Sequence, residues 1–160
     1  KYKEIEPQML EIIGKADRIQ EDLTKAVKID SEAFEDVMAA YKLPKASEEE
    51  INIRGIAIEA AMLHAAKVPL GVAEMAVEAM ELASIVTEIG NLNAISDGAS
   101  GNAVARASFT GAVLNVKINL ASLTDQDETK KLIESISSLE KRADSAEAKV
   151  NANIKNRADL

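Results

Sequence analysis

The chain has 160 residues, of which 47% are hydrophobic and only 2% aromatic, and its formal net charge is −8. This length fits a single domain over residues 1–160 with a substantial core. The acidic balance argues against a nucleic-acid partner, and the lack of cysteine excludes disulfides and thiolate metal sites. With one histidine and no charge-free apolar run of about 18 residues, we expect no metal and no membrane span. No secretory signal precedes the first helix, so a cytoplasmic protein is expected.

Helical periodicity dominates the sequence, and the shortage of aromatic residues favours helices packed through small and aliphatic side chains. Five helices are predicted, within residues 4–42, 47–68, 69–90, 96–120 and 124–157. Their limits come from prolines and capping residues: Pro44, Pro69, Ser47 with Glu50, Ser96, and Thr124 with Asp127. Short connections make successive helices antiparallel. The fold class is therefore an all-α, up-and-down bundle of about five helices, two of them long, with enough alanine faces left over to predict a dimer.

One line of side chains in the first helix contains an anomaly. At about 100° per residue, eleven positions lie on one side of this helix, and ten of them are apolar or aromatic. They are Ile5, Met9, Ile12, Ala16, Ile19, Leu23, Val27, Asp30, Phe34, Val37 and Tyr41. If this line is buried, the carboxylate of Asp30 is buried with it, and burial favours the protonated form that suits general acid–base catalysis. The alternative is that the helix bends here and Asp30 caps it or faces water.

The fourth predicted helix carries polar side chains on one face, among them Asp97, Asn115 and Asn119. The two asparagines are one turn apart and can hold the amide-like edge of a ligand, or they can form hydrogen bonds between helices. Asp97 lies about 27 Å from Asn115 along the helix, so the two can share a small site only across a symmetric interface.

The loop before this helix carries a second polar group, consisting of Asn91, Asn93 and Ser96. A helix N-terminus attracts anions and carboxylates, so these residues are candidate ligand-binding residues. Ordinary loop and capping chemistry is the alternative.

Five short segments together resemble the formiminotransferase-cyclodeaminase C-terminal family. They are Asp30-Ser31-Glu32-Ala33-Phe34, Leu43-Pro44, Ala66-Lys67-Val68-Pro69-Leu70, Gly90-Asn91 with Ser96-Asp97, and Asn115-Val116-Lys117-Ile118-Asn119-Leu120. The resemblance implies an all-helical homodimer that acts on one-carbon derivatives of tetrahydrofolate. The family reactions are cyclisation of 5-formimidoyltetrahydrofolate to 5,10-methenyltetrahydrofolate with loss of ammonia, and hydrolysis of 5,10-methenyltetrahydrofolate to 10-formyltetrahydrofolate.

The resemblance also implies roles for individual residues. Asp30 is the expected acid–base residue, and Asp97, Asn115 and Asn119 are expected to orient the pterin or the reacting carbon across the dimer. The family usually begins with a Pro-Gly-Gly-Gly segment, whereas this sequence starts at the long helix. A shortened chain, an omitted disordered segment and a member that has lost activity remain open explanations. The alternative function is therefore a non-catalytic helical dimer of the same fold.

Overall fold

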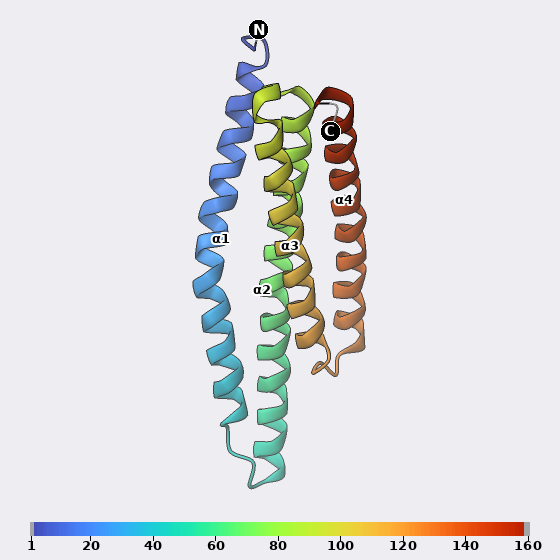
Figure 1. Ribbon diagram of the computed structural model, residues 1–160. Coiled ribbons are helices and arrows are strands. Elements are labelled where there is room, and N and C mark those ends of the chain that lie inside the picture. The colour runs from blue at the N-terminus through green and yellow to red at the C-terminus, as the bar shows by residue number, and fades with distance from the viewer. Residues whose placement is uncertain (1, 159–160) are drawn as a thin grey trace.

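A computed structural model describes residues 2–158, in which four long helices stand side by side (Figure 1). In chain order the elements are α1 (Glu6–Tyr41), α2 (Glu48–Ile89), the short 3₁₀ helix η1 (Leu92–Ala94), α3 (Ile95–Leu120) and α4 (Gln126–Ala158). The helices run alternately up and down, and α1, α3 and α4 all pack against α2. The predicted all-α class is confirmed, and α2 is the central element of the bundle.

The number of helices differs from the prediction because Pro69 does not end a helix. It lies buried inside α2, which continues without a break from Glu48 to Ile89. Proline has no N–H to donate to the carbonyl four residues earlier, which is that of Ala65. In this structure the side-chain nitrogen of Asn119 on α3 donates to that carbonyl at 2.6 Å. A contact from another helix thus supplies the hydrogen bond that the proline removes, and the predicted boundary is wrong.

The capping residues give a mixed result. Ser47 and Glu50 form the predicted capping box, with the Glu50 N–H donating to the Ser47 hydroxyl and the Ser47 N–H to the Glu50 carboxylate, both at 3.2 Å. Ser96 is not a cap, because η1 leads directly into α3 at Ile95. Thr124 is also not the cap of its helix.

The turn between α3 and α4 is held by two carboxylates instead. Asp125 accepts the N–H groups of Asp127 and Glu128 at the start of α4, both at 3.0 Å. Glu59 on α2 accepts the N–H groups of Thr124 and Asp125, both at 2.8 Å, and the Thr124 hydroxyl at 3.0 Å. These bonds lower the pKa of Glu59 below its ordinary value, the Asp125 N–H being the largest cause.

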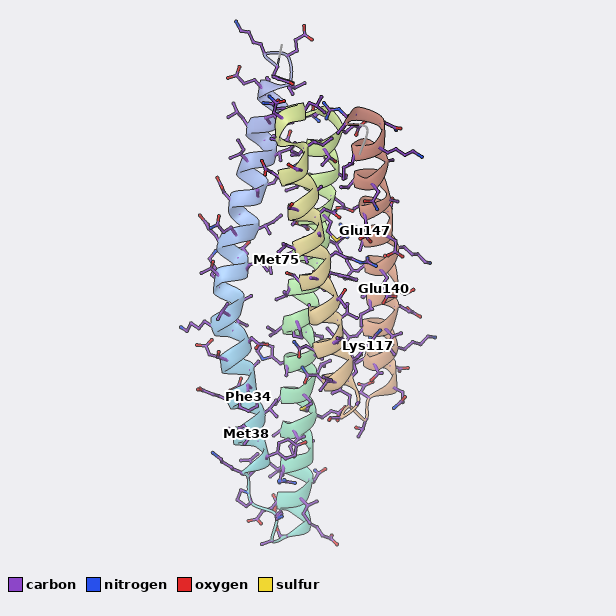
Figure 2. The ribbon with its side chains drawn as sticks, viewed as in Figure 1. Phe34, Met38, Met75, Lys117, Glu140 and Glu147 are labelled. Carbon is purple, nitrogen blue, oxygen red and sulfur yellow. The ribbon has the colours of Figure 1, made fainter. Side chains whose placement is uncertain are left out.

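The core lies between α2, α3 and α4, where α4 contributes its heptad-like seam. The buried seam residues are Leu132, Ile136, Leu139, Ala143, Ala146 and Val150. Ion pairs between Arg106 and Asp144 (2.6 Å) and between Lys117 and Glu140 (3.8 Å) join α3 to α4 near the surface. Figure 2 labels Lys117 and Glu140.

The eleven-residue line of α1 is not the buried face of that helix. Only its member Ile12 is buried, whereas Val27 is 70% and Phe34 64% exposed. The small residues Ala26, Ala33 and Ala40 face α2 instead, and they lie about 80° around the helix from the centre of the line. Small side chains let α1 approach α2 closely, so the larger side chains of the line are left beside the contact.

By length and composition alone, α2 is long and apolar enough to cross a membrane, and it is the one described helix that meets this test. Its apolar character has another explanation in this fold. Three other helices pack against α2, and the core helix of a bundle needs apolar side chains on several sides.

The substitution Gly98→Ala should destabilise the fold. A Cβ at Gly98 would lie 2.8 Å from the Thr87 Cγ2 atom. Thr87 is fully buried and its hydroxyl donates to the Ser84 carbonyl at 2.9 Å, so this methyl group cannot turn away without breaking a bond. We expect a loss of about 1–3 kcal/mol in the free energy of unfolding, measured by urea denaturation. Gly14→Ala, where a Cβ meets nothing within 4 Å, is the control and should not destabilise.

The hydrogen bonds that Glu59 accepts at the α3–α4 turn make the free energy of unfolding depend on pH. Because the pKa of Glu59 is lowered in the folded chain, its stabilising effect is present above the ordinary value of 4.5 and is lost as pH falls through the folded-state value. The difference in unfolding free energy between wild type and Glu59→Gln should therefore be constant near neutral pH and shrink below pH 4.5. Glu35→Gln, on the exposed side of α1, controls for removal of a charge. A difference that stays constant down to pH 3 would contradict stabilisation of the turn by the ionised Glu59 carboxylate.

Candidate functional site

An apolar groove runs between α1 and α3 along the surface of α2. It encloses about 630 Å³, and its walls are almost entirely aliphatic or made of small residues. From α1 it is lined by Ile12, Ala16, Ile19, Gln20, Leu23, Thr24 and Val27, from α2 by Ala79, Leu82, Ala83 and Val86, and from α3 by Gly98 and Gly101. Five members of the predicted α1 line are in this list. The line therefore faces the groove, which the described part of the chain leaves open.

Asp30 lies on the groove side of α1. At 100° per residue it is within about 20° of the lining residues Ile19 and Leu23, and it follows Val27, the last lining residue, by three positions. Its side chain is exposed in the single chain, so the prediction that Asp30 is buried within α1 is wrong for this structure. The alternative, a carboxylate that faces water, describes the single chain correctly.

The polar face of α3 continues along the helix from the groove residue Gly101. Ser108, Asn115 and Asn119 lie within about 40° of Gly101, which lines the groove. Ser108 donates to the carbonyl of its own helix at Val104, and Asn115 is exposed. Asn119 is half-buried, and its amide nitrogen donates a hydrogen bond to the Ala65 carbonyl of α2. For Asn119 the structure therefore shows the interhelical hydrogen bond that was the alternative to ligand binding.

The contacts of α2 place Asp30 and Asn115 at one level of the bundle. A cleft between α1 and α2 is lined by Asp36 and His64, and Asn119 contacts α2 one residue beyond His64. Asp30 lies about 9 Å from Asp36 along α1, and Asn115 lies about 6 Å from Asn119 along α3, both in the same direction. Both helices run in the same direction in Figure 1, and both contribute residues to the groove. Asp30 and Asn115 therefore stand at similar heights on α1 and α3, beyond the groove residues Val27 and Gly101.

The remaining four predicted residues lie at the other end of α3. The Asn91 side-chain oxygen accepts the Asn93 N–H at 3.1 Å and the Tyr2 hydroxyl at 3.3 Å. Ser96 and Asp97 are exposed in the first turn of α3. This end is about 27 Å from Asn115, so within one chain the predicted site residues form two separate groups.

An exposed apolar surface on α1 and α3 escaped sequence analysis. Val104 and Ile118 on α3 are 68% and 67% exposed, and they accompany the exposed Val27 and Phe34 of α1. Figure 2 shows Phe34 on the half of α1 nearer to the α1–α2 turn. One sequence signal is the repeat of small residues every four positions along α3, at Ala99, Ala103, Ala107 and Gly111. This pattern is typical of close helix contact, but it does not identify the partner helix.

No group of three or more histidine, cysteine, aspartate or glutamate side chains that could hold a metal is present among residues 2–158. The expected absence of a metal stays a prediction. The groove instead offers apolar walls with a carboxylate and an amide beyond one end, which suits a flat organic ligand with a few polar groups.

Three comparisons relate the chain to known proteins. The methenyltetrahydrofolate cyclohydrolase of Methylorubrum extorquens is 33% identical over 159 residues, which are 99% of this chain and 76% of that protein. The formimidoyltransferase-cyclodeaminase of Rattus norvegicus is 32% identical over 137 residues, but this chain spans only 25% of its length. The crystal structure of formiminotetrahydrofolate cyclodeaminase from Thermotoga maritima matches with a TM-score of 0.86 at 28% identity, over 98% of this chain and 74% of that one.

The family model for formiminotransferase-cyclodeaminase matches residues 1–138. This match covers α1, α2, α3 and the first part of α4, and therefore both walls of the groove. The resemblance noted in the short sequence segments is confirmed. The chain belongs to the formiminotransferase-cyclodeaminase family.

Proposed function

We propose that this chain hydrolyses 5,10-methenyltetrahydrofolate to 10-formyltetrahydrofolate, with cyclisation of 5-formimidoyltetrahydrofolate as a second activity. The observation that carries the first choice is the 33% identity to a methenyltetrahydrofolate cyclohydrolase over 99% of the chain. The likeness to a formiminotetrahydrofolate cyclodeaminase at 28% identity favours the second activity. Because the matched proteins are named as cyclohydrolases and cyclodeaminases, the predicted class of folate enzyme is confirmed.

Both reactions need a proton acceptor beside the N5–C–N10 unit of the folate. In hydrolysis a water molecule must lose a proton as it attacks the methenyl carbon, and in cyclisation N10 must lose a proton while the departing amine gains one. Asp30 supplies the only carboxylate of the α1 line. We therefore assign Asp30 the acid–base role.

Asn115 is the proposed partner of Asp30 in holding the substrate. Its side-chain amide is exposed on the groove side of α3, at the level of Asp30. An amide offers both a donor and an acceptor, which matches the amide-like edge of a pterin ring. The apolar groove next to these residues would receive the flat ring system.

We propose further that the working unit is a homodimer formed through the α1–α3 surface. Large aliphatic and aromatic side chains on both helices are more than half exposed, and soluble monomers rarely leave such a surface open. A two-fold axis near the middle of α3 would cover the groove and bring one chain's Asp97 end to the other chain's Asn115. In this arrangement the substrate site would be completed by Asn91, Asn93, Ser96 and Asp97. We also propose that the protein is cytoplasmic.

The first test is to offer the purified protein each folate separately. We expect consumption of 5,10-methenyltetrahydrofolate, followed by its ultraviolet absorbance, and slower release of ammonia from 5-formimidoyltetrahydrofolate. Ammonia release alone would reverse the order of the two activities. If a dimeric preparation turned over neither compound, the non-catalytic helical dimer would be the correct reading.

Replacement of Asp30 should remove turnover without unfolding the protein. Asp30→Asn keeps the size of the side chain but cannot accept the proton, so kcat should fall by a factor of about 10²–10⁴. Because Asp30 is exposed in the single chain, the unfolding midpoint should stay close to that of wild type. Asp17→Asn, an exposed carboxylate on another side of α1, should keep full activity. A wild-type rate for Asp30→Asn would exclude the proposed role.

The dimer prediction is tested by charging the exposed apolar surface. Phe34→Glu combined with Ile118→Glu should produce a folded monomer in analytical ultracentrifugation, because both side chains are 64–67% exposed in the single chain. If the site is shared between subunits, turnover should fall as the dimer is lost. Ile133→Glu, at a 52% exposed position on α4, is the matched control and should remain dimeric. A wild-type protein that sediments as a monomer at assay concentration would contradict the proposal.

A further inference from the structure

The buried proline of α2 leaves one carbonyl group in need of a donor. Pro69 and Ala65 are both buried, and a proline at this position cannot donate to the Ala65 oxygen. A buried carbonyl without a partner destabilises a fold, and burial here keeps bulk water away.

Asn119 meets this need from a different helix. Its side-chain nitrogen lies 2.6 Å from the Ala65 oxygen, slightly closer than is usual for N–H···O hydrogen bonds. The two residues are 54 positions apart in the chain, so the bond ties α3 to α2. By comparison, the other asparagine bond between these helices, from Asn102 to the Met80 carbonyl, is longer at 3.4 Å. The Asn119 bond is thus the shorter of these two links between α3 and α2, and it lies beside the proline.

Asn115 lies one helical turn before Asn119, on the same side of α3. A displacement of α3 along α2 would thus move Asn115 relative to Asp30, which lies on α1 beyond the groove residue Val27. Placement errors of about 1 Å can lower a rate by about a hundredfold even when the displaced contact is remote from the chemistry.

We propose that Asn119 is a positioning residue that replaces the missing N–H of Pro69 and thereby holds Asn115 at the substrate site. Its effect on folding is independent of any reaction, whereas its effect on turnover rests on the proposed function. Asn119 acts through the Ala65 carbonyl, so a second change that supplies the donor from the backbone makes its amide dispensable.

Pro69→Ala is that second change, because alanine restores an N–H four residues after Ala65. We expect Asn119→Ala alone to lower the urea midpoint of unfolding and to lower kcat/KM by about tenfold to a hundredfold. In the background of Pro69→Ala, the same Asn119→Ala change should leave the urea midpoint unchanged. It should also leave kcat/KM within about twofold of the value for the Pro69→Ala protein. Rescue by a distant backbone change is the signature of positioning.

Asn115→Ala provides the matched control, since this residue is proposed to contact the substrate. Its loss of turnover should be the same with and without Pro69→Ala. If Asn119→Ala is rescued in stability but not in turnover, Asn119 touches the substrate and the positioning role is overturned. An equal drop in the urea midpoint in both backgrounds would overturn the hydrogen-bond replacement itself. The midpoint needs no substrate, so it decides this point even if the proposed reaction fails.

Discussion

The bundle depends on the continuity of α2 across Pro69. The hydrogen bond from Asn119 to the Ala65 carbonyl, at 2.6 Å, allows a proline to sit in the middle of a 42-residue helix. Because α2 is unbroken, it forms a single wall against which α1, α3 and α4 all pack. The groove lies on this wall, between α1 and α3.

The sequence predicted much of the fold where local chemistry determines structure. The capping box at Ser47 was predicted because it depends on residues that are close in the chain. The boundary at Pro69 was wrong because the compensating donor comes from a residue 50 positions later. Local rules describe what a proline removes from its own helix and cannot show what another helix supplies.

The candidate site illustrates a second limit. Periodicity identified the α1 face that contains Asp30, but it did not show that α2 packs against a different face of α1. The nearby alanines take the contact with α2, so the line borders the groove and Asp30 is exposed. The approximate agreement in height between Asp30 and Asn115 required the contacts of α2 with both flanking helices. The separation of Asp97 from Asn115, in contrast, followed from the rise per residue of one helix.

The central claim is that the groove between α1 and α3 receives the folate, with Asp30 and Asn115 beyond one end of it. Amide chemical-shift mapping by nuclear magnetic resonance tests this most directly, using a stable tetrahydrofolate that carries a formyl group on N5. The account predicts that the largest saturable shifts cluster around Asp30 in α1 and around Asn115 in α3. Saturable shifts confined to the outer face of α4, with both groove walls unchanged, would contradict it.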